Sequence, residues 1–191
     1  MKRESTVKYI LRLTLTLLII CAVVAGILAA VNSVTAPIIA AAKEEKTLKA
    51  IQVVLPGAEN LVEIPFTDES GMVTKVYCTD STKLAIPSSY AVEVAPSGFG
   101  GAITMMVGIN HYGKVTGISI ISHAETPGLG AVAAASTDKG AAFRDQFIGL
   151  IAGITIGDGD NQIDSLSGAT ISSQAIVDGV NAALACVANL G

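Results

Sequence analysis

The longest uninterrupted apolar pattern lies near the N-terminus. Between Arg12 and Lys43 there are thirty residues without a charge, and they begin with LTLTLLIICAVVAGILAAV. A helix needs about 20 apolar residues to cross the hydrocarbon core of a bilayer. The pattern therefore predicts a transmembrane helix over 13–36, without a charged or histidine side chain that could serve an ion path. A cleaved signal peptide is the alternative, but its apolar region usually has about 7–15 residues.

The apolar pattern changes after this segment. Residues 37–58 are expected to continue as a stalk helix, and Pro56 is expected to end it. Leu48, Ile51 and Leu55 fall at positions i, i+3 and i+7, which lie on one face of a helix. The pattern therefore predicts a short stalk with one apolar face.

Residues 59–191 begin with patterns typical of strands. Four runs rich in β-branched residues and bounded by Gly, Pro or Asp predict strands at 72–79, 89–95, 101–110 and 114–122. Residues 111–113, His-Tyr-Gly, separate the last two runs and form a hairpin signal with glycine at the bend. A further short strand is expected at 153–156.

Two helical patterns complete this part of the chain. The first is expected over 137–151, with Thr137 and Asp138 as cap candidates and an apolar face of Phe143, Phe147, Leu150 and Ile151. The second is expected over 171–188, with an apolar face of Ile176, Val180, Ala183, Leu184 and Val187. Strands in a run followed by helices predict an α+β domain over 59–191, with helices packed on an antiparallel sheet.

Charge gives the predicted span a direction. Residues 1–12 carry four basic side chains against one acid, so the positive-inside rule predicts a cytoplasmic N-terminus and an extracytoplasmic C-terminal domain. Beyond the span there are eight basic and fifteen acidic residues, a net charge of −7. Because a nucleic-acid partner requires a basic footprint, this composition argues against a nucleic-acid-binding protein.

Cysteine and histidine offer little chemistry. Cys21 lies inside the predicted span, while Cys78 and Cys186 are compatible with a disulfide or with two buried free thiols. The chain contains no Cys-x-x-Cys and only two histidines, His111 and His123. No metal site is predicted, because zinc takes three or four protein ligands.

The stretch DSLSGATISSQ at 164–174 places small hydroxyl residues around a glycine just before the last predicted helix. One hydroxyl could be an ordinary N-cap. Alternatively, the unpaired N–H groups at the helix start could hold a phosphate, with Gly168 allowing a close approach. A serine or threonine nucleophile is a third interpretation, although Gly-x-Ser-x-Gly is absent. These residues alone leave the choice open.

Two other stretches are rich in polar or glycine residues. In SHAETPGLGA at 122–131, His123 and Glu125 would point the same way on an extended chain. In APSGFGGAI at 95–103, three glycines flank Phe99, which suits either a flexible turn or a backbone lying against a planar ring. The strand–helix context of a dinucleotide fingerprint is missing here.

In this order, the anchor, PSGFGG, SHAETPGLG and DSLSGATISS resemble the G subunit of the Rnf complex, an ion-translocating ferredoxin:NAD oxidoreductase. The C subunit of the sodium-pumping NADH:quinone oxidoreductase is similar and shares the same FMN-binding domain. The resemblance covers nearly the whole chain. It implies an electron-transfer subunit that carries FMN and has no catalytic residue of its own.

The resemblance also implies how the flavin is held. In this family a phosphodiester joins FMN to the threonine of Ser-Gly-Ala-Thr, which is Thr170 here. A separate flavin transferase makes the bond from FAD outside the membrane. The residues implied to cradle the phosphate are Ser167, Gly168, Ala169, Ser172 and Ser173. The residues implied to line the isoalloxazine ring are His123, Glu125, Thr126, Leu129 and Gly130.

The implied partners are the multi-span subunits of the complex, which exchange electrons with this flavin. Two alternatives remain. The chain could be the corresponding subunit of a sodium-pumping quinone reductase, although those chains tend to be longer. It could also be an anchored module that binds an anion or a flavin without a covalent bond.

Overall fold

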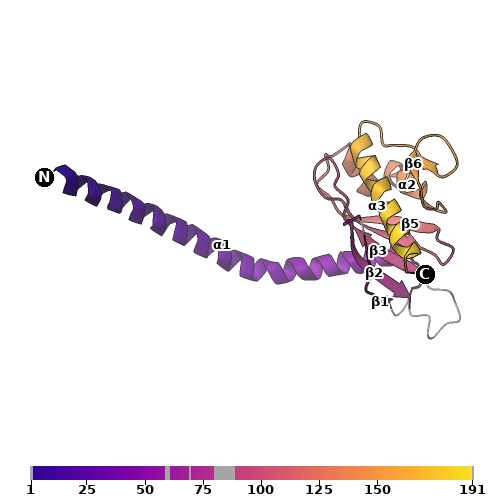
Figure 1. The fold of residues 1–191 in the computed structure, drawn as a ribbon, viewed down its shortest axis with the longest axis horizontal. Coiled ribbons are helices and arrows are strands. Elements are labelled where there is room, and N and C mark those ends of the chain that lie inside the picture. Colours follow the sequence, from indigo (N-terminus) through magenta and orange to yellow (C-terminus); the bar gives the residue numbers. More distant parts are fainter. Residues whose placement is uncertain (1, 59–60, 69, 80–88, 191) are drawn as a thin grey trace. The chain divides into compact units, whose positions relative to one another are not determined.

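The computed structural model describes residues 2–58, 61–68, 70–79 and 89–190, with side chains from residue 8 onward. Parts of the predicted N-terminus and outer domain (residues 1, 59–60, 69, 80–88 and 191) lie outside the described residues. The chain divides into two compact units, Met1–Glu45 and Lys46–Gly191. Figure 1 shows the elements of both.

The first unit belongs to helix α1 (Lys2–Val54), which continues through Pro37 without a break. All large apolar side chains from Tyr9 to Ile39 are exposed. By length and composition, α1 and the C-terminal helix α3 (Thr170–Ala188) could each cross a membrane. However, 67% of the apolar window of α3 is buried inside the second unit, which is the behaviour of a core helix.

The second unit is built on a five-stranded antiparallel sheet in the order β1-β2-β3-β4-β5, so that each strand pairs with the next along the chain. The strands are β1 (Leu61–Glu63), β2 (Val73–Thr79), β3 (Tyr90–Val94), β4 (Thr104–Ile109) and β5 (Val115–Ser122). The four strands predicted in this region are confirmed as β2 to β5. Strand β1 was not predicted, because three residues give too short a pattern.

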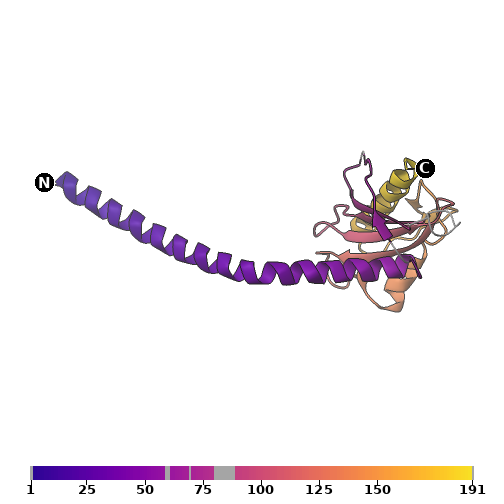
Figure 2. The same ribbon diagram turned by 90° about the horizontal axis from the view of Figure 1, so that it is seen from below.

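Helices cover the two faces of the sheet. Helix α3 packs on one face, and its predicted apolar residues are all buried in the larger core. On the other face, the last turns of α1 bury Ala50, Ile51 and Val54 against β3, β4 and β5. In Figure 2 the sheet lies between these two helices. The domain is therefore α+β, as predicted.

The predicted apolar face of the stalk was partly wrong. Leu48 is exposed, whereas Thr47 is buried together with Ala50, Ile51 and Val54. These four follow an i, i+3, i+4, i+7 pattern that includes a threonine and an alanine, so apolar size alone did not identify the face. Helix α1 ends at Val54, just before the predicted stop at Pro56.

A glycine pair on the sheet allows this close packing. Gly108 of β4 and Gly117 of β5 face each other in the register. A Cβ on Gly108 would lie 2.6 Å from the carbonyl oxygen of Val54. The Thr116 hydroxyl donates a hydrogen bond to that same carbonyl at 2.6 Å. The end of α1 is thus fixed to the sheet by both shape and hydrogen bonding.

The helix predicted over 137–151 is wrong at its C-terminal end. Helix α2 covers only Asp138–Asp145, with the predicted Thr137 as N-cap accepting from the N–H of Gly140. Single turns follow, and Gly149 adopts φ +84°. Its N–H donates to Val115 at 2.8 Å, which returns the chain to the sheet.

Smaller elements complete the fold. A 3₁₀-helix, η1 (Gly130–Ala134), was not predicted, and the expected strand at 153–156 is β6 (Thr155–Ile156), paired with β7 (Gln162–Ile163). The predicted hairpin between β4 and β5 is confirmed, with Gly113 at φ +71°. The described cysteines are free thiols.

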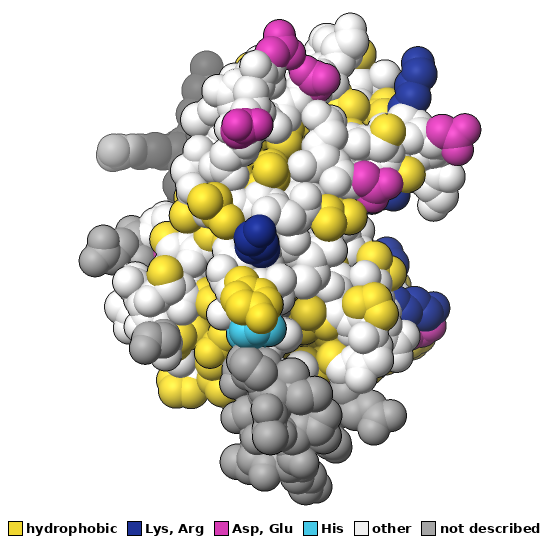
Figure 3. Space-filling view, turned by 90° about the vertical axis from the view of Figure 1, so that its right-hand side faces the viewer, with side chains coloured by type: hydrophobic (Ala, Val, Ile, Leu, Met, Phe, Trp, Pro, Cys, Tyr) yellow, Lys and Arg dark blue, Asp and Glu magenta, His cyan; other side chains and the backbone are white. Residues whose placement is uncertain are grey.

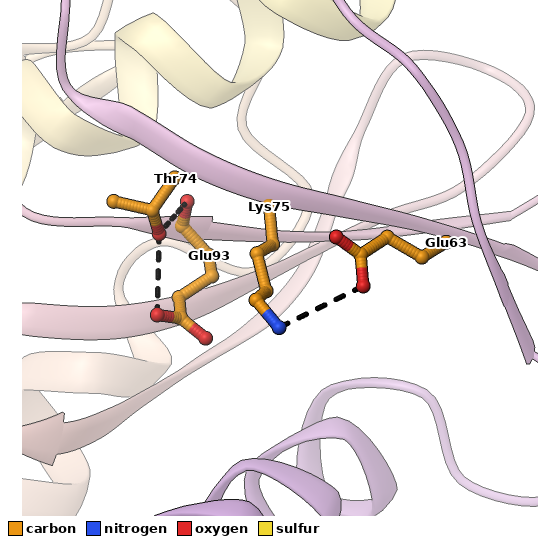
Figure 4. Close-up of polar contacts among 4 residues, drawn as sticks. All are labelled: Glu63, Thr74, Lys75 and Glu93. Carbon is orange, nitrogen blue, oxygen red and sulfur yellow. Dashed lines mark hydrogen bonds and ion pairs between the residues drawn. The ribbon is translucent and has the colours of Figure 1, made fainter.

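Polar pairs link the neighbouring strands β1, β2 and β3 (Figure 4). The Thr74 hydroxyl donates to the carboxylate of buried Glu93 at 3.2 Å, and Lys75 lies 3.6 Å from Glu63. The second pair is half exposed and therefore contributes little to stability.

On the face shown in Figure 3, basic side chains are scattered among acidic and apolar ones and form no continuous patch.

Candidate functional site

A pocket of about 370 Å³ lies where three segments of the second unit meet. The segments are the tip of the β3–β4 hairpin, the loop from β5 into η1, and the first turn of α3. Its volume is in the range of small-molecule and cofactor sites. The lining residues are Phe99, Glu125, Thr126, Leu129, Gly130, Gly168, Ala169, Thr170, Ile171 and Ser172.

The start of α3 forms one wall of the pocket. Its N-cap is Ala169, which has no side chain to cap the helix, so the interpretation of the hydroxyl cluster as an ordinary N-cap is wrong. No described residue accepts a hydrogen bond from the N–H groups of Thr170, Ile171 and Ser172. Three unpaired donors at the positive end of a helix favour an anion.

Gly168 shapes the approach to this helix end. It adopts φ +74°, a left-handed conformation in which other residues are strained. A Cβ at this position would lie 3.2 Å from a methyl group of Leu129. The glycine therefore reverses the chain just before α3 and leaves room for Leu129 at the pocket.

The hydroxyl side chains of the motif have different environments. Thr170 is exposed at the pocket, and its hydroxyl makes no hydrogen bond with the described residues. Ser172 is buried and donates to the carboxylate of Glu125. Ser173 is fully buried, donates to the Ala169 carbonyl at 3.0 Å and accepts from the Leu166 N–H. Ser167 is exposed but does not line the pocket.

Glu125 is buried at the back of the pocket, with only 6% of its surface exposed. Its carboxylate accepts hydrogen bonds from the Ser172 hydroxyl and, at 2.9 Å, from the Gly100 N–H. His123 is exposed and does not line the pocket, although its Nδ1 accepts from the Glu125 N–H at 3.2 Å. The extended alternation does not reach these residues, because β5 ends at Ser122, and the exposed His123 and the buried Glu125 lie in different surroundings.

Large apolar side chains form the rim of the pocket and remain open to solvent. Phe99 is 70% exposed, Ile171 59% and Leu129 43%. Exposed apolar groups around a concave site are typical of a surface that binds a ligand or a partner. Among the described residues, no group of three or more His, Cys, Asp or Glu side chains could hold a metal ion.

The sequence identified most of this site but missed three parts of it. Phe99 lies in the glycine-rich stretch 95–103, whose sequence suits either a flexible turn or a contact with a planar ring, and no sequence pattern indicates a role for the Gly100 N–H. Ile171 was missed, although a signal existed. It is apolar but lies off the buried stripe that contains Ile176 and Val180, so helical periodicity alone predicts an exposed position.

Two family models match separate parts of the chain. The model of the RnfG N-terminal region matches residues 1–54, and that of the FMN-binding domain matches residues 98–185. Together with the relatives described below, one of which is 34% identical over 96% of this chain, the first match shows that the chain belongs to the RnfG family. The second match identifies the domain that contains the pocket as an FMN-binding domain.

Several relatives carry the same name within their complexes. The G subunit of the Na⁺-translocating ferredoxin:NAD⁺ oxidoreductase complex of Acetobacterium woodii is 34% identical, covering 96% of this chain and 94% of the relative. The G subunit of an ion-translocating oxidoreductase complex of Methanosarcina acetivorans is 31% identical over 94% and 95% of the two chains. The G subunit of the proton-translocating ferredoxin:NAD⁺ oxidoreductase complex of Clostridium ljungdahlii is 29% identical over 96% and 95%.

A solved structure is similar over part of the chain. The crystal structure of the C subunit of Na⁺-translocating NADH-quinone reductase from Parabacteroides distasonis superposes with a TM-score of 0.45 at 18% identity. The match covers 58% of this chain and 59% of that one.

The residues of the pocket fit FMN at both ends of the cofactor. The unpaired N–H groups of α3 suit a phosphate. The exposed apolar rim of Phe99, Leu129 and Ile171 suits a planar aromatic ring system. Among the described residues, this is a built binding site with complementary polar and apolar parts.

Proposed function

We propose that this chain is the electron-transfer subunit of an Rnf-type ion-translocating ferredoxin:NAD oxidoreductase and carries FMN on Thr170 through a phosphodiester. Its place among the G subunits of ion-translocating oxidoreductases supports the first part. The matches to RnfG favour this complex over the sodium-pumping quinone reductase. Bound FMN would supply the redox chemistry, and the protein would position it and set its surroundings.

One observation carries the covalent part of the proposal. Thr170 is the first residue of α3, lies on the pocket, is exposed, and has a hydroxyl without a partner among the described residues. It therefore stands beside the three unpaired N–H groups at which a phosphate would be held. Ser172 and Ser173 use their hydroxyls inside the protein and are not open to modification.

The roles of the remaining residues follow from their positions. Gly168 and Ala169 would leave the approach to the phosphate open, and the backbone of the first turn would donate to it. Thr126, Leu129 and Gly130 would line the ring together with Phe99 and Ile171. Ser167 and His123, which lie beside the pocket, would act at its outer margin, whereas Ser173 would support the phosphate site from within the helix.

The attachment would exchange one bond for another. With FAD as donor, the hydroxyl oxygen of Thr170 would bond to the phosphorus of the FMN half while the phosphoanhydride bond to AMP breaks. The threonine proton leaves, and AMP is the second product. No base lies within hydrogen-bond distance of this hydroxyl among the described residues, which supports a separate flavin transferase as the catalyst.

Helix α1 supports a membrane location. Its exposed apolar stretch fits a single membrane crossing at 13–36 followed by a stalk, and the basic N-terminus fits a cytoplasmic position. In this arrangement the flavin domain is extracytoplasmic, and its partners are the membrane subunits of the same complex.

The covalent bond is tested by intact-mass measurement. The full chain, expressed with a flavin transferase and purified in detergent, should gain the mass of one FMN less one water. Thr170→Ala should abolish this gain, and Ser136→Ala, a matched change at an exposed hydroxyl outside the pocket, should retain it.

Two results would contradict the proposal. A wild-type mass equal to that of the bare chain would exclude covalent FMN, and yellow colour lost on denaturation would then indicate a noncovalent flavin module. A mass gain that survives Thr170→Ala would move the attachment to another residue.

A further inference from the structure

Glu125 connects three parts of the site. It belongs to the loop after β5, one carboxylate oxygen accepts from the Gly100 N–H at the hairpin tip, and the other accepts from the Ser172 hydroxyl in the first turn of α3. Gly100 lies 25 residues before Glu125 in the sequence, and Ser172 lies 47 residues after it. One buried side chain therefore links the hairpin tip to the first turn of α3 through both of its oxygens.

Glycines enclose this carboxylate on two sides. A Cβ on Gly98 would collide with one Glu125 oxygen, and a Cβ on Gly130 would lie 2.5 Å from both the other oxygen and the Ser172 hydroxyl. A Cβ on Gly100 would collide with the carbonyl oxygen of Ala124. The chain therefore approaches Glu125 so closely that only glycine is accommodated at these positions.

The hairpin tip, residues 97–102, makes few other hydrogen bonds. Within the tip, the N–H of Gly98 donates to Gly101 at 2.8 Å, and Ser97 bridges to Ala102. These bonds close the turn on itself and do not attach it to α3. The bond from Gly100 to Glu125 is the hydrogen bond in the described residues that connects the tip to the opposite wall of the pocket.

Phe99 is the residue whose position depends on this bond. It precedes Gly100, lines the pocket and is 70% exposed, so packing against the protein does not hold it. We propose that Glu125 is a positioning residue that ties the β3–β4 tip to α3 and thereby sets Phe99 at the mouth of the flavin pocket. The inference deepens the proposed function and rests on it for the identity of the ligand.

The proposal differs from a direct electrostatic role. A charge acting on the flavin depends on the ionised carboxylate, whereas a tie depends on hydrogen-bonding atoms. Glutamine keeps both links, because its amide oxygen can accept from Gly100 while its NH₂ donates to the Ser172 oxygen, which also accepts. Alanine removes both links. Glu125→Gln and Glu125→Ala therefore separate charge from position.

Hydrogen exchange of the full-length chain without flavin, in detergent, measures the tie directly. In Glu125→Ala, peptides covering 97–102 should exchange about ten-fold faster than in the wild type, since the tip loses its hydrogen bond to Glu125. Glu125→Gln should stay within about three-fold. Glu93→Ala, which removes another buried glutamate bound to a threonine hydroxyl (Figure 4), should leave 97–102 unchanged.

Each outcome decides the matter. Unchanged exchange at 97–102 in a folded Glu125→Ala protein overturns the proposal. If Glu125→Ala loses protection from exchange throughout β3 to β5, the variant is unfolded and Ser172→Ala is measured in its place. That variant removes only the link to α3, and its exchange at 97–102 must rise at least about three-fold.

A second measurement extends the test to the flavin. In protein that carries FMN, iodide should quench flavin fluorescence more strongly in Glu125→Ala than in the wild type, and Glu125→Gln should resemble the wild type. Equal quenching in all three would exclude an effect on the pocket mouth. The exchange experiment needs no flavin. A wild type that gains no FMN mass would therefore overturn the proposed covalent attachment, while the role of Glu125 would still be tested by exchange.

Discussion

Four hydroxyl side chains lie within seven residues at the start of α3, and of these Thr170 alone presents an unpaired hydroxyl to the pocket among the residues that the structure describes. Their direction around the helix decides this. Ser173 lies three residues before Ile176 and seven before Val180, on the buried stripe, so periodicity predicts its burial. The partner of Ser172 could not be predicted, because Glu125 lies 47 residues away and only the fold brings it close.

Asp68, before β2, offers a test at the scale of one residue. Partial burial opposes its ionisation, but hydrogen bonds from the Val73 N–H and from the hydroxyl and N–H of Ser70 outweigh this and lower its pKa below 3.8. A carboxyl group whose pKa is lower in the folded state contributes stability above its unfolded pKa. That contribution disappears as the pH falls through the folded value.

The Asp68→Ala variant should therefore be less stable than the wild type at about pH 7, by about 1 kcal/mol, and the difference should shrink at about pH 2.5. Urea unfolding of the detergent-solubilised chain measures both values. Asp158→Ala, a change at an exposed carboxylate, serves as the control and should show little difference at either pH. A stability difference for Asp68→Ala that grows toward acid would contradict the assigned direction of the pKa.

At the scale of elements, the glycine pair between β4 and β5 explains how a helix can lie so close to the sheet. A Cβ on Gly108 would be 2.8 Å from the Val54 Cβ, while a Cβ on Gly117 would be 3.8 Å from the Val54 Cα, an ordinary contact. Gly108→Ala should lower the free energy of unfolding by about 1–3 kcal/mol. Gly117→Ala, on the neighbouring strand, should change it by less than about 0.5 kcal/mol.

Thermal unfolding of the two variants, followed by circular dichroism, measures the difference. Equal melting temperatures for Gly108→Ala and Gly117→Ala would show that the end of α1 does not constrain this position.

Elements with a regular pattern were predicted well, and elements defined by tertiary contacts were not. The β-branched runs of β2 to β5 and the helical stripe of α3 are local signals, and both are confirmed. The predicted helix at 137–151 was too long because Phe147 and Leu150 fit a helical stripe. In the structure, Phe147 is buried from a turn, and Gly149 directs the chain back to Val115. Such a stop depends on the sheet and not on local sequence.

At the scale of the whole molecule, the compact unit that starts at Lys46 includes the last turns of α1. A chain beginning at Lys46 should fold and accept flavin, whereas a chain beginning at Ala58 should not fold. The shorter chain lacks Ala50, Ile51, Val54 and Leu55, whose burial contributes on the order of 5 kcal/mol, and total stability is typically about 5–15 kcal/mol.

Circular dichroism and intact mass after co-expression with a flavin transferase would test both chains. A cooperative melt and a normal flavin gain in the chain that begins at Ala58 would contradict the role assigned to these turns.

The site as a whole was predicted by a different route from the fold. The residues of the hydroxyl cluster alone left an N-cap, a phosphate site and a nucleophile all open. The order of several motifs along the chain indicated the family. Of the apolar rim, Leu129 was implied by the family resemblance, and Ile171 was missed although helical periodicity predicts its exposure. Neither route identified Phe99, because its exposure follows from what does not cover it.

The placement of α3 has a consequence for the order of synthesis. The strands of the sheet are neighbours in sequence and can pair as they emerge, but α3 is the final helix and closes the larger core. The threonine proposed to receive the flavin is the first residue of that closing helix. A chain interrupted before residue 170 would lack the proposed attachment residue, so flavin loading at this position would require synthesis to have reached α3.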